Sequence, residues 1–149
     1  MGTIDQEVKT RFANNRQRFI TNLFFTSNHF QNMFTDILRP YDLSIPQLNI
    51  LRILRGAGKA VTMNNVKTLM IDKAPNLTRL TDKLLAKKLI ARQRSDQDRR
   101  VVYISVSKEG MSLLEKIDND EAFNNLNFLE RISEEEAKHF SNLLDRIRE

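Results

Sequence analysis

The stretch ARQRSDQDRRVVYISVSKEG, residues 91–110, sets a cluster of arginines and aspartates between two runs that alternate between polar and apolar side chains. Alternation with a period of two indicates β-strands, and we expect strands at residues 89–95 and 101–106. The charged segment between them is typical of a tight turn. This part of the sequence therefore predicts a β-hairpin with a charged tip.

The tip of this hairpin carries charged side chains of both signs. Arg99 and Arg100 can lie along a phosphate backbone or enter a minor groove. Asp96 and Asp98 can hold the turn and orient the guanidinium groups. The sequence leaves open which of the two arginines would enter the groove.

Two short helices joined by a tight turn are expected just before the hairpin. Thr62 is a candidate N-cap for the first helix, and Pro75 suits the first position of the second, because its missing N–H would be unpaired there anyway. In the second helix Leu77, Leu80 and Leu84 point to one side and leave the polar residues on the other. This arrangement predicts a helix-turn-helix.

The outward side chains of the second helix have the chemistry that reads DNA. Asn suits adenine and Arg suits guanine in the major groove, so Asn76, Thr78 and Arg79 are predicted to contact base edges. Other basic side chains on this helix and the next strand are predicted to meet phosphates: Lys83, Lys87, Arg92 and Arg94. A solvated charged face is the alternative for each of them.

Positive charge is concentrated in the middle of the chain. The net charge of the 149 residues is +5. Residues 73–100 alone carry nine basic and three acidic side chains, whereas residues 107–149 carry six basic and eleven acidic ones. A dense basic segment beside an acidic tail favours a localised surface for a polyanion.

The N-terminal segment is rich in phenylalanine. Apolar side chains recur at helical spacing over residues 6–38, and Pro40 ends the pattern, so one long helix is expected there. Six of the nine phenylalanines lie in it: Phe12, Phe19, Phe24, Phe25, Phe30 and Phe34. A helix this long and aromatic is expected to continue its apolar stripe into a second subunit.

Capping signals mark where several other helices begin and end. Ser44 with Gln47, and Ser133 with Glu136, fit capping boxes, and Ser107 fits an N-cap. The GAGK sequence at 56–59 lacks the spacing of a phosphate-binding loop and follows a helix, so a helix C-terminus and turn are expected there.

These segments together resemble the MarR (multiple antibiotic resistance regulator) family of winged-helix transcription regulators. The resemblance spans nearly the whole chain and is carried by LTRLTDKL at 77–84, by DQDRRV at 96–101 and by SVSKEG at 105–110. Where such sequences commonly have a left-handed glycine before the first hairpin strand, this chain has Lys88. The second helix of the helix-turn-helix must therefore end without that glycine or with a strained lysine.

The resemblance implies a mainly α fold, with a winged helix-turn-helix domain at 44–107 and dimerisation helices at 6–38 and 108–149. It implies a homodimer that binds double-stranded DNA at a pseudo-palindromic operator and regulates transcription, with repression expected. A constitutive DNA-binding or architectural protein without an effector is the alternative.

Members of the family often release DNA when a small aromatic or anionic molecule binds between the dimerisation helices and the winged domain. Candidate residues for such a cleft are Phe24, His29, Phe30, Phe34, Tyr41 and Arg52. A phenylalanine stripe at this spacing also fits an ordinary core. Because His139 is far from His29 in the sequence, a metal site is not expected. No cofactor is expected either.

Other functional classes find little support. The chain has no cysteine, which excludes a disulfide and a thiolate nucleophile. No motif pairs a histidine with a nucleophile, so an enzyme is not expected. No signal peptide or apolar stretch of membrane-spanning length is present, and a cytoplasmic protein without membrane contact is expected.

Overall fold

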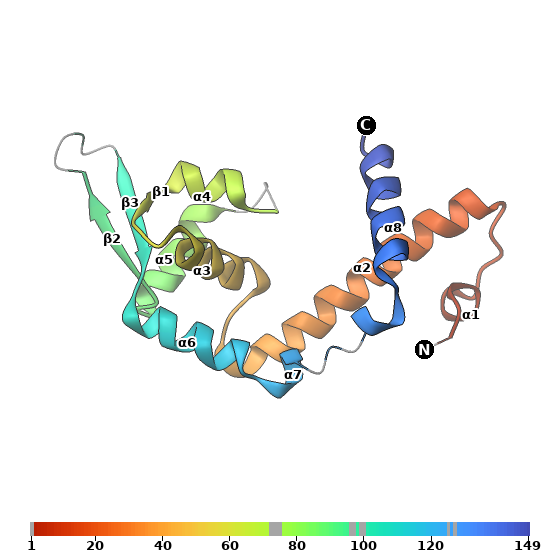
Figure 1. The fold of residues 1–149 in the computed structure, drawn as a ribbon, viewed down its shortest axis with the longest axis horizontal. Helices are drawn as coiled ribbons and strands as arrows, with labels where there is room; N and C mark the ends of the chain where they lie inside the picture. Colours follow the sequence, from red (N-terminus) through yellow and green to blue (C-terminus); the bar gives the residue numbers. More distant parts are fainter. Residues whose placement is uncertain (1, 72–75, 96–97, 99–100, 125, 127) are drawn as a thin grey trace. The chain divides into compact units, whose positions relative to one another are not determined.

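The computed structural model describes residues 2–71, 76–95, 98, 101–124, 126 and 128–149 (Figure 1). The chain divides into two units, Met1–Leu114 and Glu115–Glu149. Among the described residues, all strands lie in the first unit, together with the helices that carry the predicted DNA-binding side chains.

The hairpin belongs to a small antiparallel sheet that is surrounded by helices. The elements are α3 (Ile45–Ala57), β1 (Val61–Thr62), α4 (Met63–Leu69), α5 (Leu77–Ala86), β2 (Ile90–Arg94) and β3 (Val102–Val106). The strand order is β1-β3-β2, and Ile104 of β3 pairs with Val61 on one side and Arg92 on the other. The predicted hairpin is confirmed to within one residue at each strand end, whereas β1 was not predicted.

Apolar side chains from these elements form one core. Figure 1 shows α3, α4 and α5 grouped against the sheet, and α3 contacts both β3 and α5. The buried side chains include Leu48, Ile50, Leu51, Leu54, Val66, Leu84, Ile90 and Ile104. Each contributes about 1.5–3 kcal/mol relative to an exposed position. This core fixes α5 against the hairpin.

Local capping places the helices of this domain. Ser44 and Gln47 form the predicted capping box at the start of α3, and Gly58 ends the helix with a left-handed φ of 62°. Thr62 caps α4 as predicted, because its hydroxyl oxygen accepts a hydrogen bond from the Asn65 amide. The first helix of the helix-turn-helix thus begins where the sequence indicates.

The start of α5 differs from the prediction. The first helical residue is Leu77, and Asn76 is the N-cap, with its side-chain oxygen accepting a hydrogen bond from the Arg79 amide. The described helix therefore begins at Leu77, later than the predicted start, because the Asn76 side chain caps it. Pro75 itself lies outside the described residues.

The end of α5 is tied to the start of α6 (Lys108–Asp118). Lys88 adopts the left-handed conformation, with φ of 59°, so the strained lysine considered above is what the chain uses. The Ser107 hydroxyl donates to the Lys88 carbonyl at 2.7 Å and accepts from the Gly110 amide at 2.9 Å. Ser107 is thus the predicted N-cap of α6 and also a link to the end of α5.

The predicted single helix over residues 6–38 is wrong, because the chain forms two helices there. These are α1 (Ile4–Val8) and α2 (Asn15–Leu38). Lys9 ends α1 in the left-handed conformation, and the Asn14 side chain caps α2 by accepting from the Gln17 amide at 3.0 Å. A capping asparagine and a left-handed residue interrupt the helical hydrogen bonds despite the continuous apolar spacing.

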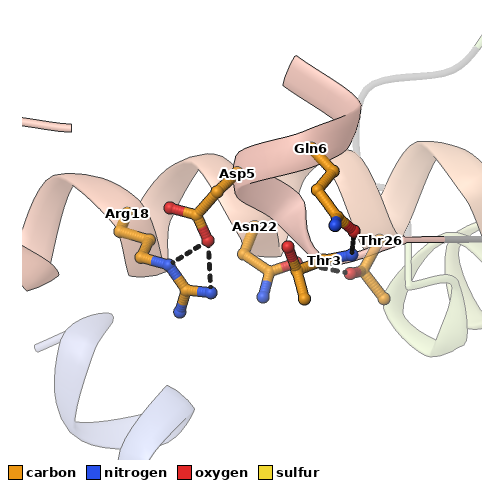
Figure 2. Close-up of polar contacts among 6 residues, drawn as sticks. All are labelled: Thr3, Asp5, Gln6, Arg18, Asn22 and Thr26. Carbon is orange, nitrogen blue, oxygen red and sulfur yellow. Dashed lines mark hydrogen bonds and ion pairs between the residues drawn. The ribbon is translucent and has the colours of Figure 1, made fainter. Parts of the chain in front are cut away.

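A buried side chain and an ion pair hold α1 against α2. Ile4 is buried, and Asp5 of α1 accepts two hydrogen bonds from the Arg18 guanidinium, at 2.7 and 2.9 Å (Figure 2). The Arg18 hydrogen bond lowers the pKa of Asp5. Both guanidinium nitrogens donate to the same oxygen, Asp5 Oδ2, and this contact links α1 to α2.

The phenylalanine-rich helix α2 buries little of its apolar surface completely. All of its residues are described, and only Leu38 is buried. Phe24 is 66% exposed and Ile20 is 39% exposed. A short 3-10 helix, Arg39–Tyr41, then leads through Asp42 into α3.

The second unit consists of the end of α6 and three further elements. They are α7 (Glu121–Asn124), a 3-10 helix at Leu129–Arg131, and α8 (Glu134–Ile147). Ser133 and Glu136 form the predicted capping box of α8, no residue of α8 is buried, and Phe140 is half exposed. No helix among the described residues combines the length and apolar character needed to span a membrane.

Candidate nucleic-acid interface

The outer face of α5 presents the polar side chains that the sequence assigns to it. Thr78, Arg79 and Lys83 are exposed, whereas Leu84 is buried. The buried Thr81 hydroxyl is hydrogen-bonded to carbonyls of the preceding turn, at 2.9 Å. One side of α5 is therefore held in the core while the other offers hydroxyl, guanidinium and ammonium groups.

Asn76 has a structural role in addition to the predicted one. Its side-chain oxygen accepts from the Arg79 amide at 3.4 Å and so satisfies the first turn of α5. An asparagine that reads adenine uses both its oxygen and its nitrogen. The cap occupies one lone pair of that oxygen, so a base contact by Asn76 stays a prediction.

The strand β2 carries two of the predicted phosphate contacts. Arg92 Nη1 lies 3.2 Å from the carboxylate of Asp82 on α5, which fixes the guanidinium beside the helix. Arg94 follows two residues later, so both side chains leave the same face of the strand. Both arginines are exposed or partly exposed.

Lys87 lies apart from the exposed row on α5. Its ammonium is 2.8 Å from the carboxylate of Asp42 and also donates to the Asp42 carbonyl. The Lys87 hydrogen bond lowers the pKa of Asp42, which has the left-handed φ of 50°. The structure thus uses Lys87 to join the end of α5 to the segment before α3, and its predicted phosphate contact would require this pair to open.

The turn of the hairpin is only partly described. The Ser95 amide donates to the Val101 carbonyl at 3.0 Å, the Val101 amide donates to the Asp98 carbonyl at 2.9 Å, and the Asp98 amide donates to the Ser95 hydroxyl at 3.3 Å. These bonds close the turn through the backbone of Asp98, and the predicted role of its side chain in holding the turn stays a prediction. Three other predicted tip residues lie outside the described residues: Asp96, Arg99 and Arg100.

A hollow of about 640 Å³ opens between the end of α2, the start of α3 and the end of α5. It is lined by Thr35, Arg39, Asp42, Leu43, Ser44, Gln47, Lys83, Ala86 and Lys87. Arg39, Lys83 and Lys87 give it cationic groups, and Asp42 gives it a carboxylate. This chemistry suits a small molecule with an anionic group.

None of the six residues predicted for an effector cleft lines that hollow. Phe24 is exposed, and the rings of the half-buried His29 and Phe30 contact each other at a tilt of 50°, with centroids 5.7 Å apart. Phe34 and Tyr41 are half-buried, and Arg52 is exposed. Among the described residues, no three His, Cys, Asp or Glu side chains are grouped for metal binding.

A second hollow, of about 300 Å³, lies at the start of α5 beside the hairpin. Its lining residues are Thr62, Met63, Asn64, Thr78, Arg92, Val101 and Val102. The sequence did not indicate Asn64 or Asp82 as parts of the interface. Their positions depend on how α4, α5 and β2 pack, and no local motif signals that packing.

Comparison with known proteins gives a consistent result. The family model described as transcriptional regulator SarA/Rot matches residues 32–117, more than half of the chain. The uncharacterized HTH-type transcriptional regulator YhbI of Bacillus subtilis is 31% identical over 80 residues. That match covers 54% of this chain and 51% of YhbI, so it spans about half the length of that relative.

Solved structures share the fold. A putative MarR-like transcription regulator from Bacillus cereus has a TM-score of 0.75 at 16% identity, covering 90% of this chain and 96% of that one. The MepR–DNA complex of S. aureus has a TM-score of 0.70 at 26% identity, covering 85% and 94%. The predicted fold class, mainly α with a winged helix-turn-helix of the MarR type, is confirmed.

Proposed function

Because this chain belongs to the SarA/Rot family of transcriptional regulators, we propose that it acts by binding double-stranded DNA in a sequence-specific way. The observation that carries the proposal is the exposed row Thr78, Arg79 and Lys83 on a helix that the core holds beside a β-hairpin. The similar MepR of S. aureus has been solved as a DNA complex, which supports the same partner here.

In this proposal α5 is the recognition helix and enters a major groove. Arg79 would read guanine through its two parallel N–H donors, and Lys83 would meet a phosphate further along the helix. Arg94 on β2 would add a phosphate contact. The tip arginines, Arg99 and Arg100, would hold the minor groove or its backbone, as the sequence predicts.

We further propose that the protein binds as a homodimer. The apolar faces of α2 and α8 support this, because Phe24 is 66% exposed and Phe140 is 50% exposed. Two recognition helices related by a twofold axis would meet successive major grooves about 34–36 Å apart. A pseudo-palindromic operator follows from that symmetry. Action on chromosomal DNA also agrees with the cytoplasmic location expected above.

Repression with release by a small effector is the proposed mode of control. The hollow lined by Arg39, Lys83 and Lys87 supports an anionic effector, because a bound anion would compete with Asp42 for Lys87. A thermal-shift series with aromatic acids checks this, since a ligand that binds only the folded state raises the melting temperature. If no compound in the series shifts the melting temperature, the constitutive alternative is favoured.

Selection of bound duplexes from a random pool tests the DNA-binding proposal. We expect enrichment of an inverted repeat, and footprinting should show two protected half-sites about one helical turn apart. Binding without any enriched sequence would contradict sequence-specific recognition. No binding at low salt would contradict the DNA partner itself, because phosphate contacts are strongest under that condition.

A further inference from the structure

The smaller hollow lies where five elements meet, at the start of the proposed recognition helix. Its polar lining consists of Thr62 from β1, Asn64 from α4, Thr78 from α5 and Arg92 from β2. Val101 and Val102, at the start of β3, form an apolar wall. In the part of the chain that the structure describes, no carboxylate lines this hollow, whereas hydroxyl, amide and guanidinium groups do. Such a lining favours a small oxyanion.

One donor of this hollow, Arg92, is paired with a neighbouring carboxylate, and two other side-chain donors are unpaired within the described part of the chain. Arg92 Nη1 is bonded to Asp82 at 3.2 Å, which fixes the guanidinium and leaves other N–H donors of the group to point elsewhere. Thr78 lies one helical turn before Asp82 on the same face of α5. Among the described residues, the side chains of Asn64 and Thr78 have no hydrogen-bond partner. Three donor groups are therefore available around one space.

We propose that this hollow seats one phosphodiester group of the bound DNA, held by Asn64, Thr78 and Arg92. The inference rests on the proposed DNA-binding function and adds a defined contact to it. It gives Asn64 a role that the sequence did not suggest and moves Thr78 from base reading to the backbone. A phosphate fixed between the recognition helix and the hairpin would set the register of both on the duplex.

A double-mutant cycle tests whether Asn64 and Arg92 share one phosphate. Affinity is measured by fluorescence anisotropy on the selected operator over a series of salt concentrations, after circular dichroism has shown that each variant is folded. Arg92→Ala should reduce the slope of log affinity against log salt by about 0.9. Asn64→Ala should weaken binding about tenfold, as expected for a hydrogen bond to a charged group, with base preference unchanged.

The chain supplies a matched control in Arg94, which has the same charge and lies on the same face of the same strand. If Asn64 and Arg92 hold the same phosphate, their effects on operator affinity are coupled. The loss of affinity in the double variant Asn64→Ala with Arg92→Ala should then be smaller than the product of the two single losses, by at least about threefold. The double variant Asn64→Ala with Arg94→Ala should lose affinity by the full product of its two single effects. If both double variants lose affinity by the product of their single effects, or if Asn64→Ala has no effect, the proposal is overturned while DNA binding itself stands.

Chemical changes in the DNA provide a second readout. Replacing each phosphate in turn by an uncharged methylphosphonate should identify one linkage per half-site whose replacement weakens the wild-type protein but not the Asn64→Ala, Arg92→Ala variant. The absence of any such linkage would overturn the proposal. Inorganic phosphate could also raise the melting temperature of the wild type but not of Arg92→Ala. That result, together with no coupling between Asn64 and Arg92 in DNA affinity, would assign the hollow to a free anion instead. Failure of the wild type to bind any duplex would overturn the proposed function as well.

Discussion

Arg79 lies on the exposed side of the first turn of α5, where its backbone amide is bonded to the Asn76 cap. We expect Arg79→Ala to weaken operator binding by about 1–3 kcal/mol and to relax the base preference at one position of each half-site. Affinities for the operator and for its single-base variants, determined by fluorescence anisotropy, measure both effects. Lys83→Ala is the control, because loss of a phosphate contact should weaken all sequences alike. An unchanged base preference in Arg79→Ala would remove Arg79 from sequence reading.

The pair of Asp42 and Lys87 should make stability depend on pH. The Lys87 hydrogen bond holds the pKa of Asp42 below its usual value, so the pair stabilises the fold at neutral pH. That contribution is lost as the pH falls through the lowered pKa of Asp42. Asp42→Asn, which keeps a residue tolerated at positive φ, should lower the melting temperature slightly at pH 7.

Melting curves across pH check this prediction. The difference in melting temperature between the wild type and Asp42→Asn should disappear in acid. It should also become smaller in high salt, because both side chains reach solvent. Lys87→Met should show the same loss at pH 7, and the double variant should lose no more than either single one. A constant difference at all pH values would mean that the ion pair does not contribute.

At the scale of elements, two glycines should respond in opposite directions to the same change. A Cβ at Gly110 would lie 2.2 Å from the Leu89 carbonyl oxygen, so Gly110→Ala should destabilise the fold by about 1–3 kcal/mol or more. At Gly56, inside α3, a Cβ meets nothing within 4 Å, and Gly56→Ala should stabilise by about 0.4–1 kcal/mol. Urea titrations measure both. Equal effects at the two positions would show that the close approach at Gly110 relaxes freely.

Elements set by local chemistry could be predicted from the sequence. The caps at Ser44, Thr62, Ser107 and Ser133 were predicted because each acts on amides within a few residues of itself. The strands were found by their alternation. The two residues of β1 were missed because so short a strand has no measurable period, and its existence depends on pairing with β3.

Other features could not be predicted, because they depend on packing or because two signals conflict. Val8, Phe12 and Phe19 keep helical spacing across residues 9–14, so periodicity predicted a helix that Lys9 and Asn14 interrupt. In the candidate interface, α5 and its exposed side chains were predicted from local pattern. The partners of Arg92 and Lys87 were not, since Asp82 and Asp42 reach them only in the folded chain.

At the scale of the whole molecule, the exposed apolar faces predict self-association. Phe24→Glu on α2 should shift the protein from dimer to monomer, because a charge would have to be buried in the interface. Sedimentation velocity measures the shift, and operator affinity should fall with it as one half-site is lost. Asn15→Glu is the control: it adds the same charge to an exposed position on the opposite side of α2. A dimer that survives Phe24→Glu would place the interface elsewhere.

The link between Lys88, Ser107 and Gly110 also decides how this protein can be re-engineered. One hydroxyl group joins the end of α5 to the start of α6, and the Gly110 backbone lies directly against Leu89. A chimera that took α5 from one regulator and α6 from another would have to rebuild that contact across the fusion point. A transplant of DNA specificity should therefore move residues 76–110 as one cassette, with its downstream boundary after Gly110.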